Sequence, residues 1–427
     1  MRRFWPPLVL LCAVGCAKVA PGGPAPDGGR AASGRGVVDR EPQRRDETSF
    51  MREFPEVQPA EPCFAPGGEP LGLSSLLDRA AARFDTGDYQ GALRCAEEAS
   101  RFEPSSIEAH HDRAAALLRL GRTDEARTAL ERALALDPDD PETLAAAADL
   151  YINRLPPGPD VTEAGLELAR RGARLVQRRR RANHERGLYA RLSLLEAQAQ
   201  NDLGKPREAL ARADAALVAL QGLSGIDPQL RTDADYERAV ALFELCRFED
   251  AKKALRDLVA RRPDHAHAHQ QLGLVLERFG DAEGSARHFA LARKLAPDEL
   301  HAPLELSFAE FARVVEKAVA ELPAALRRDL AGIPVEPAEL PAEADLLLED
   351  PPLSPTILGL YRGLPLLASA QVGASDEPRS IAIYRKNLLR VVSSKEDLER
   401  EVSKTLLHEL GHLHGEDDGA LRARGLE

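Results

Sequence analysis

The sequence predicts a mainly α-helical protein, with a solenoid of helical repeats followed by a small α+β domain. Aromatic residues make up only 4% of the chain and charged residues 30%, which suits helices rich in Ala, Leu, Arg and Glu. A helical pattern recurs every 34 residues over much of the chain, and short β-branched runs appear where this period stops. At 427 residues the chain is too long for one compact core, so we expect separate domains.

The first residues have the pattern of an export signal. Arg2 and Arg3 precede an apolar run over residues 4–14, which is too short to remain as a transmembrane helix but suits the core of a signal peptide. We therefore expect residues 1–16 to be a targeting segment that is removed during export.

The apolar run ends in the letters AVGC, which resemble the lipobox of bacterial lipoproteins. The resemblance implies that Cys16 is lipidated and becomes the membrane anchor. Ala13 stands where Leu is commonest, so ordinary secretion is the alternative. Because Ala17 rather than Asp follows the cysteine, we expect a lipoprotein that faces the periplasm at the outer membrane.

Residues 17–72 are rich in Pro, Gly and Ala and predict a flexible tether, because such a stretch cannot bury enough apolar surface to offset the entropy of ordering. Beyond the signal, the cysteines are Cys63, Cys95 and Cys246. Their odd number and wide spacing match neither a disulfide framework nor a zinc cluster. We expect Cys95 and Cys246 to be small buried apolar residues.

Two segments align when one is shifted by 34 residues: Gly87 then matches Gly121, and Pro104 matches Pro138. A second pair of segments further along shows the same match. This period, with small residues where two helices touch and a proline after the second helix, resembles the tetratricopeptide repeat. We count about six repeats over residues 73–298.

The resemblance implies helix pairs that stack into a right-handed superhelix with a concave groove. Such a groove binds peptides or other proteins, so we expect a protein partner or substrate there. The alternative is that the array only spaces the tether from the last domain.

The net charge of −12 is spread over segments of mixed sign. The one basic cluster, residues 178–181, has no aromatic residues between its arginines that could stack on bases. We therefore expect no nucleic-acid partner and interpret the cluster as a solvated helix face.

Residues 299–427 predict a second folded domain, because the repeat period has stopped. Residues 304–322 carry apolar side chains along one helical face. Ser393 and Ser394, each with an acidic residue three positions on, mark the start of a final helix. Between these helices, short runs bounded by Gly and Pro predict strands of a small sheet. These runs are residues 332–337, 358–364 and 380–385.

His408, Glu409 and His412 form the pattern HExxH in the final helix. The histidines are four residues apart, so both imidazoles can reach one zinc ion at about 2.0–2.1 Å, with Glu409 beside them to act on a water. The alternative is a plain helix end, where histidines lie favourably near the negative end of the dipole. Structural zinc sites normally have four ligands, often cysteines, and no cysteine follows Cys246, which favours an open, catalytic site.

A glycine, Gly415, follows the second histidine and allows the chain to turn back, so that Asp418 can become the third zinc ligand. Asp417, Glu416 or His414 could take its place, and the sequence does not rank these residues.

From residue 308 onward the chain resembles the small zincin-like metallopeptidases called minimal zincins. The matching segments are FARVVEKAVAELP, GIPVEP, ILGLYRGLPL, IAIYRKNLLR and EREVSKTLLHELGHLHGEDDGAL. The resemblance implies a compact α+β domain in which His408 and His412 bind zinc, Asp418 is the acid after the glycine and Glu409 is the catalytic acid/base. The two residues after the second motif histidine depart from the family's usual pattern, which affects the wall of the site more than the metal.

These residues predict peptide-bond hydrolysis, in which Glu409 takes a proton from a zinc-activated water and passes it to the leaving amine. Tyr361, Tyr384 and Arg385 are candidates for stabilising the oxyanion. If residues 380–385 form an exposed edge strand, an extended peptide could pair with it beside the zinc.

The sequence thus predicts an exported, membrane-tethered zinc metallopeptidase whose repeats recruit a protein partner or substrate. The alternative is a non-catalytic tetratricopeptide scaffold of an envelope protein complex, in which the last domain holds zinc for structure or is inactive.

Overall fold

The computed structural model describes residues 63, 72–177, 182–225, 227–366 and 378–426. The predicted signal peptide, Cys16, nearly all of the tether and the arginine cluster at 178–181 lie outside these residues. Within the described ranges, no helix is long and apolar enough to cross a membrane.

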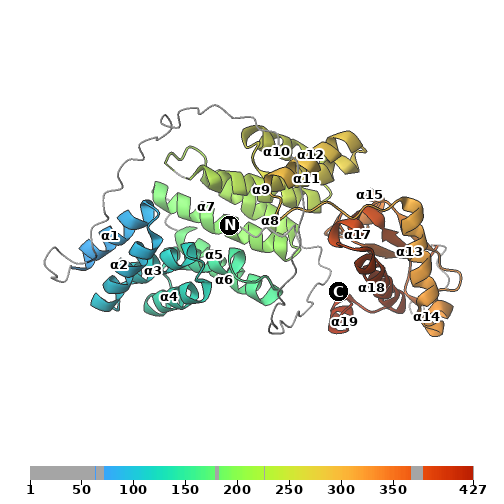
Figure 1. The fold of residues 1–427 in the computed structure, drawn as a ribbon, viewed down its shortest axis with the longest axis horizontal. Coiled ribbons are helices and arrows are strands. Elements are labelled where there is room, and N and C mark those ends of the chain that lie inside the picture. Colours follow the sequence, from blue (N-terminus) through green and yellow to red (C-terminus); the bar gives the residue numbers. More distant parts are fainter. Residues whose placement is uncertain (1–62, 64–71, 178–181, 226, 367–377, 427) are drawn as a thin grey trace, which may run out of the picture.

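Helices α1 to α12 form the predicted solenoid, in which consecutive helices pack against one another along the chain (Figure 1). Alanines fill the contacts between helices: Ala92, Ala126 and Ala251 are at most 2% exposed. The helices are α1 (Leu73–Asp85), α2 (Tyr89–Phe102), α3 (Ile107–Arg119), α4 (Thr123–Leu136), α5 (Pro141–Asn153), α6 (Pro159–Gln177), α7 (Asn183–Asp202), α8 (Pro206–Ala219), α9 (Pro228–Glu244), α10 (Phe248–Arg261), α11 (Ala266–Arg278) and α12 (Ala282–Leu295).

In five of the six helix pairs the turn contains a left-handed residue, which explains the glycine period of the sequence. Gly87, Gly121, Gly204 and Gly280 have φ values of 82°, 74°, 65° and 72°. Cys246 takes the same position between α9 and α10, with φ 56°. A positive φ costs glycine little but strains a residue with a Cβ atom. Cys246 is also buried with a free thiol, as the sequence predicted.

Cys63 and Cys95 form a disulfide, with their Cα atoms 5.2 Å apart. The expectation that these cysteines form no disulfide was therefore wrong. Cys95 is fully buried on α2, and the bridge joins the end of the tether to the first helix pair beside Leu76 and Ala80. The odd number of cysteines misled the prediction, because the unpaired Cys246 lies in a different repeat.

A three-stranded sheet with helices around it forms the C-terminal domain, and the three predicted strands are present. The strand order is β1-β3-β2, with β1 parallel and β2 antiparallel to β3. The strand at residues 380–384 is therefore central, and the idea that it is an exposed edge was wrong. The elements are α13 (Phe308–Glu321), α14 (Ala324–Asp329), β1 (Val335–Ala338), α15 (Glu343–Leu346), β2 (Gly359–Arg362), β3 (Ser380–Tyr384), α17 (Arg385–Val391), α18 (Lys395–His414) and α19 (Asp418–Ala423).

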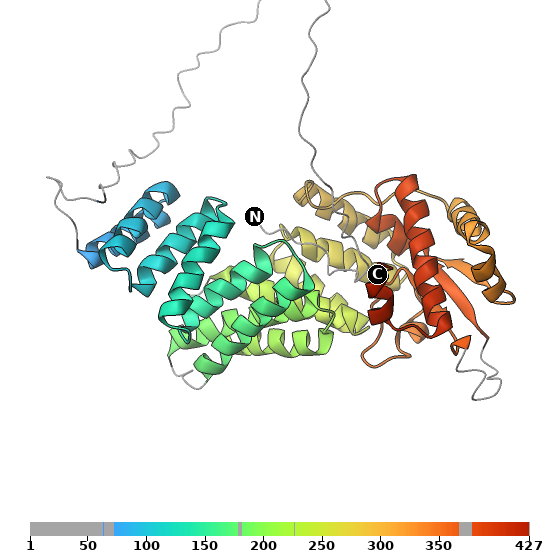
Figure 2. The same cartoon turned by 90° about the horizontal axis from the view of Figure 1, so that it is seen from below.

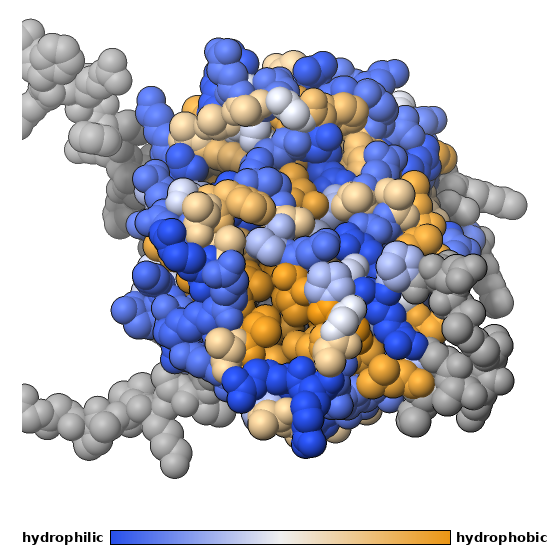
Figure 3. All heavy atoms as spheres, turned by 90° about the vertical axis from the view of Figure 1, so that its right-hand side faces the viewer, coloured by the Kyte–Doolittle hydropathy of each residue, from blue (hydrophilic) through white to orange (hydrophobic). Residues whose placement is uncertain are grey.

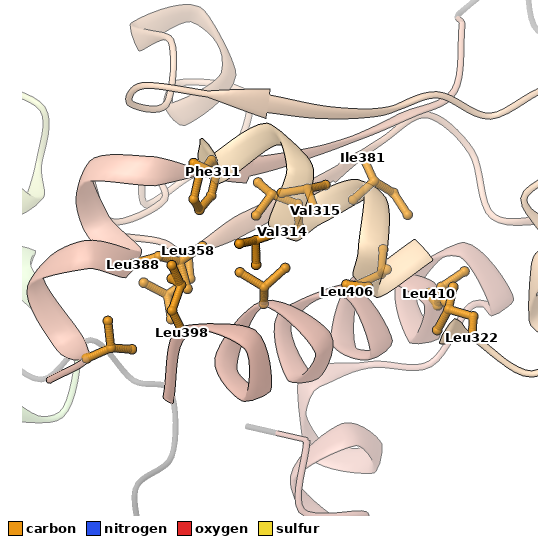
Figure 4. Packing of buried hydrophobic residues seen from close by; sticks show 14 of the residues in the cluster. Phe311, Val314, Val315, Leu322, Leu358, Ile381, Leu388, Leu398, Leu406 and Leu410 are labelled. Carbon is orange, nitrogen blue, oxygen red and sulfur yellow. The ribbon is translucent and has the colours of Figure 1, made fainter. Parts of the chain in front are cut away.

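Helices α13 and α18 pack against each other through an apolar stripe (Figure 4). Phe311 and Val315 of α13 belong to the same buried cluster as Leu398, Leu406 and Leu410 of α18. Full burial of such a side chain contributes about 1.5–3 kcal/mol. This stripe fixes the long helix α18, whose last turns carry the predicted zinc motif.

The C-terminal domain packs against the last repeats of the solenoid. Leu346 of α15 is fully buried in a cluster with Phe243 of α9 and Leu272 of α11. Glu277 of α11 also forms ion pairs with Lys386 and Arg390 of α17. In both ribbon views α19 lies on the side of the domain that faces the solenoid (Figure 1, Figure 2).

The outer side of the C-terminal domain is not uniformly polar. Figure 3 shows apolar side chains gathered in a hollowed area that charged residues frame. Val319, Leu326 and Ile333 are partly exposed residues that pack onto the core of this domain. The core of this domain is therefore not completely covered.

Candidate metal centre

The helix α18 carries the predicted motif and is capped at both ends. Ser394 Oγ accepts a hydrogen bond of 3.1 Å from the backbone N–H of Asp397, as the capping signal predicted. At the other end Gly415 adopts a left-handed conformation with φ 87° and terminates the helix. The chain then turns, so that α19 begins at Asp418 close to the last turns of α18.

The two motif histidines face a common point, with their Nε2 atoms 3.0 Å apart. His408 Nδ1 lies 2.9 Å from the carbonyl oxygen of Leu426, and His412 Nδ1 lies 3.0 Å from that of Glu416. A carbonyl oxygen can only accept, so each ring carries its proton on Nδ1. Each ring therefore presents Nε2, the nitrogen that can bind a metal, toward this common point.

The carboxylate of Asp418 lies close to both histidines. Its Oδ1 lies 3.7 Å from His408 Nε2 and 3.3 Å from His412 Nε2. Within the residues that the structure describes, these three form the one group of side chains suited to hold a metal ion, with donor atoms within 4.8 Å of one another. Two neutral imidazoles and one carboxylate fit zinc, and a set of three ligands leaves a coordination position open.

The other three candidates for the third ligand have different partners. The Asp417 side chain accepts a hydrogen bond of 2.8 Å from the Ala420 N–H and caps α19. The Glu416 carboxylate pairs with Arg424, and His414 Nε2 lies 3.2 Å from an oxygen of Asp329. The geometry therefore favours Asp418 over these alternatives.

Glu409 is buried between α18 and β2, with 5% of its surface exposed. Its Oε2 accepts a hydrogen bond of 2.7 Å from the backbone N–H of Tyr361. Burial raises the pKa of this carboxyl to about 8, against the lowering effect of the Tyr361 hydrogen bond, and the Asp418 carboxylate adds to the rise. Gly359 provides the space, because a Cβ there would lie 2.8 Å from Glu409 Oε1.

Two of the three residues proposed to stabilise an oxyanion have other partners. The third, Tyr384, is fully buried on β3, and its hydroxyl has no hydrogen-bond partner among the described residues. Arg385 pairs with Glu339 at 2.7 Å and donates to a backbone carbonyl. The hydroxyl of Tyr361 donates to the carbonyl of Leu364 at 2.7 Å. These contacts argue against Arg385 and the Tyr361 hydroxyl in that role, whereas Tyr384 stays a candidate.

Sequence reasoning missed two backbone groups at the site, the N–H of Tyr361 and the carbonyl of Leu426. Backbone groups are common to all residue types, so neither leaves a signal of its own. Gly359 was the one available signal, because a glycine inside a strand often marks a close approach by another part of the chain.

Comparisons with known proteins agree with this architecture. Residues 330–426 match the family described as zincin-like metallopeptidase. Residues 83–151 and 236–299 match two family models described as tetratricopeptide repeat. The chain thus combines tetratricopeptide repeats with a C-terminal zincin-like metallopeptidase domain. A search of curated proteins finds no match.

Solved structures similar to this chain are tetratricopeptide-type proteins. PilW, a type IV pilus biogenesis factor, is 18% identical, with a TM-score of 0.44 over 53% of this chain and 96% of PilW. PilF of Pseudomonas aeruginosa is 15% identical, with a TM-score of 0.42 over 53% of this chain and 92% of PilF. YrrB, described as having an unusual peptide-binding site, is 15% identical, with a TM-score of 0.35 over 48% of this chain and 93% of YrrB.

Proposed function

We propose that this protein is a zinc-dependent metallopeptidase. The observation that carries the proposal is the convergence of His408, His412 and Asp418 beside the buried Glu409, in a domain that matches the zincin-like metallopeptidases. Three protein ligands leave room for a water and a substrate carbonyl, whereas structural zinc sites are normally closed by four.

Each residue of the site has a separate role in the proposed hydrolysis. Zinc, when bound, supplies a Lewis acid that polarises the peptide carbonyl and lowers the pKa of a water. His408 and His412 would hold zinc through Nε2, while their Nδ1–H groups donate to backbone carbonyls. Glu409 takes a proton from the attacking water on a carboxylate oxygen and gives it to the leaving amine. A pKa raised toward neutrality suits a group that must both accept and release a proton.

The edge of β2 that faces away from β3 pairs with no other strand of the described residues, and we expect an extended substrate to lie along it. The Tyr384 N–H donates to the carbonyl of Leu358, so Leu358 faces β3. Backbone groups alternate in direction along an antiparallel strand, and those of Gly359 and Tyr361 therefore point away from β3. The Tyr361 N–H meets Glu409 on that side. A peptide paired with this edge would place a peptide bond beside Glu409.

The repeats recruit or position the protein substrate in this proposal. Tetratricopeptide arrays generally bind peptides or proteins along a concave surface. Because α19 lies on the side of its domain that faces the solenoid (Figure 2), we expect a polypeptide held by the repeats to extend toward this helix. The ion pairs of Glu277 with α17 support a fixed arrangement of the two parts.

We further propose that the protein is an exported lipoprotein, anchored through Cys16 and facing the periplasm, at the outer membrane. The proposed division is a signal peptide at 1–16, a tether at 17–72, repeats at 73–298 and a peptidase domain at 299–427. The lipobox pattern supports this, and so does the disulfide between Cys63 and Cys95, because disulfides persist in oxidising compartments.

The test is the zinc content of the purified protein, measured by elemental mass spectrometry beside a His408→Ala variant. About one zinc per chain, lost in the variant, is the result we expect for this set of ligands. A folded wild-type protein that holds no zinc after metal is added would contradict the proposal. A non-catalytic scaffold would then be the better account.

A further inference from the structure

The last residues of the described chain fold back onto the metal helix. After α19, the Leu426 N–H donates to the carbonyl of Leu421 at 3.1 Å. This bond holds the Leu426 carbonyl oxygen 2.9 Å from His408 Nδ1. The carbonyl acceptor of His408 therefore comes from 18 residues further along the chain, whereas that of His412 comes from Glu416, directly after the helix.

A close contact between helices fixes this arrangement. Leu421 of α19 is fully buried. It lies against Gly411, between the two motif histidines, where an added Cβ would lie 2.2 Å from Leu421 Cδ2. Only a residue without a side chain leaves room for this contact. Gly411 thus allows α19 to approach α18 closely enough for the following residues to reach His408.

We propose that the backbone carbonyl of Leu426, held in place by the contact of Leu421 with Gly411, is the positioning group that orients His408 for zinc binding. This inference rests on the proposed zinc site. A carbonyl that accepts the Nδ1–H bond sets both the tautomer and the ring plane of a histidine ligand, and loss of such partners typically lowers metal affinity by 10–100-fold. The carbonyl touches no substrate, so its role is positional.

The experiment compares two truncations of the full chain. A chain that stops after Gly425 lacks the acceptor, whereas a chain that stops after Leu426 keeps an oxygen at the same place. We measure zinc affinity by competition with a chelator. We expect the shorter chain to bind zinc about 10–100-fold more weakly than wild type, and the longer one to stay within about threefold. Thermal unfolding without metal should be similar for all three chains, which separates positioning from a loss of fold.

A spectroscopic signature tests the contact directly. In the protein with 15N-labelled histidine, the His408 Nδ1–H proton should give a slowly exchanging signal in wild type and in the chain ending at Leu426. It should disappear from the chain ending at Gly425. Gly411→Ala, which displaces Leu421, should weaken the same signal and lower zinc affinity.

Equal zinc affinity in both truncations, with wild type binding zinc, would overturn this inference and leave the proposed peptidase intact. A wild-type protein that binds no zinc would overturn both.

Discussion

The carboxylate of Glu409 accepts a hydrogen bond of 2.7 Å from the backbone N–H of Tyr361, on the edge of β2 that faces away from β3. This contact joins the proposed catalytic residue to the strand along which we expect a substrate to lie. A substrate carbonyl that pairs with the same N–H would take the place of Glu409 there. In the proposed mechanism we therefore expect substrate binding to release the carboxylate toward the zinc site.

Gly359→Ala tests the space that Glu409 needs. The new Cβ would lie 2.7 Å from Thr405 Cγ2 and 2.8 Å from Glu409 Oε1, so the carboxylate must move. We expect unchanged zinc content, a loss of stability of about 1–3 kcal/mol and peptidase activity reduced at least about tenfold. Gly158→Ala is the control, because nothing lies within 4 Å of its added Cβ. Wild-type activity in Gly359→Ala would show that Glu409 does not depend on this space.

Glu409→Gln separates zinc binding from hydrolysis. The glutamine oxygen can still accept the Tyr361 hydrogen bond, but the side chain cannot take up a proton. We expect zinc content to remain and the cleavage rate to fall by about 10²–10⁴-fold, measured by mass spectrometry on a mixture of peptides. Glu396→Gln, an exposed change at the start of the same helix, should leave the rate unchanged. Equal cleavage rates in wild type and Glu409→Gln would show that Glu409 is not the catalytic base.

Asp418→Asn tests the third ligand against its neighbours. Asparagine keeps the size of the side chain but removes the charged oxygen that lies 3.3 Å from His412 Nε2. We expect zinc affinity to fall by a factor of about ten or more in this variant, since loss of a group that only hydrogen-bonds to a metal ligand already lowers metal affinity about tenfold. Asp417→Asn, which keeps the cap of α19, and Glu416→Gln should bind zinc nearly as wild type. A larger loss of zinc affinity in either of these two variants would identify that residue, rather than Asp418, as the third ligand.

The helix α18 and its motif could be predicted because the signals are local. Ser394 and Gly415 each act within one turn of their own position, and the four-residue spacing of His408 and His412 determines that they share a face. The repeats were predictable for a related reason: most of their turns use the same left-handed backbone conformation, so glycine recurs with the repeat.

Contacts between distant segments could not be predicted in this way. The strand β3 is central because β1 and β2, which both precede it by more than 15 residues in the chain, lie on either side of it in the sheet. A short apolar run looks the same in sequence whether its strand is at an edge or in the centre. The bond between His408 and the Leu426 carbonyl involves a backbone atom, which the residue type does not reveal. The pairing of Cys63 with Cys95 likewise depends on where the tether meets the first repeat.

Cys95→Ser tests the disulfide and the compartment that it implies. The bridge spans 32 residues and restricts the unfolded chain, so its loss should lower the free energy of unfolding of the first repeats by about 2–4 kcal/mol. Wild type under reducing conditions should show the same loss. Thiol labelling of the unfolded, unreduced protein should modify Cys246 and leave Cys63 and Cys95 unmodified. Labelling of all three residues in protein isolated from the cell envelope would contradict the bridge.

Glu244→Gln tests a buried acid where the C-terminal domain meets the solenoid. Glu244 ends α9, and one of its carboxylate oxygens is buried without a hydrogen-bond partner. Burial raises the pKa of this carboxyl from its ordinary value of 4.5 to about 7, although a hydrogen bond with Ser354 opposes the rise. Between these two values the folded protein keeps a proton that the unfolded chain has released. Stability should therefore fall as the pH rises from 4.5 to 7.

Glutamine has nearly the shape of the protonated acid and cannot ionise, so Glu244→Gln should remove this part of the fall. We expect its Tm to match wild type near pH 4.5 and to exceed it by about 2–4 °C at pH 8. Some pH dependence should remain, because burial also raises the pKa of Asp202 to about 6. Glu283→Gln, at an exposed position on α12, should follow the wild-type profile. A constant difference in Tm between wild type and Glu244→Gln at every pH would show that Glu244 does not titrate in this window.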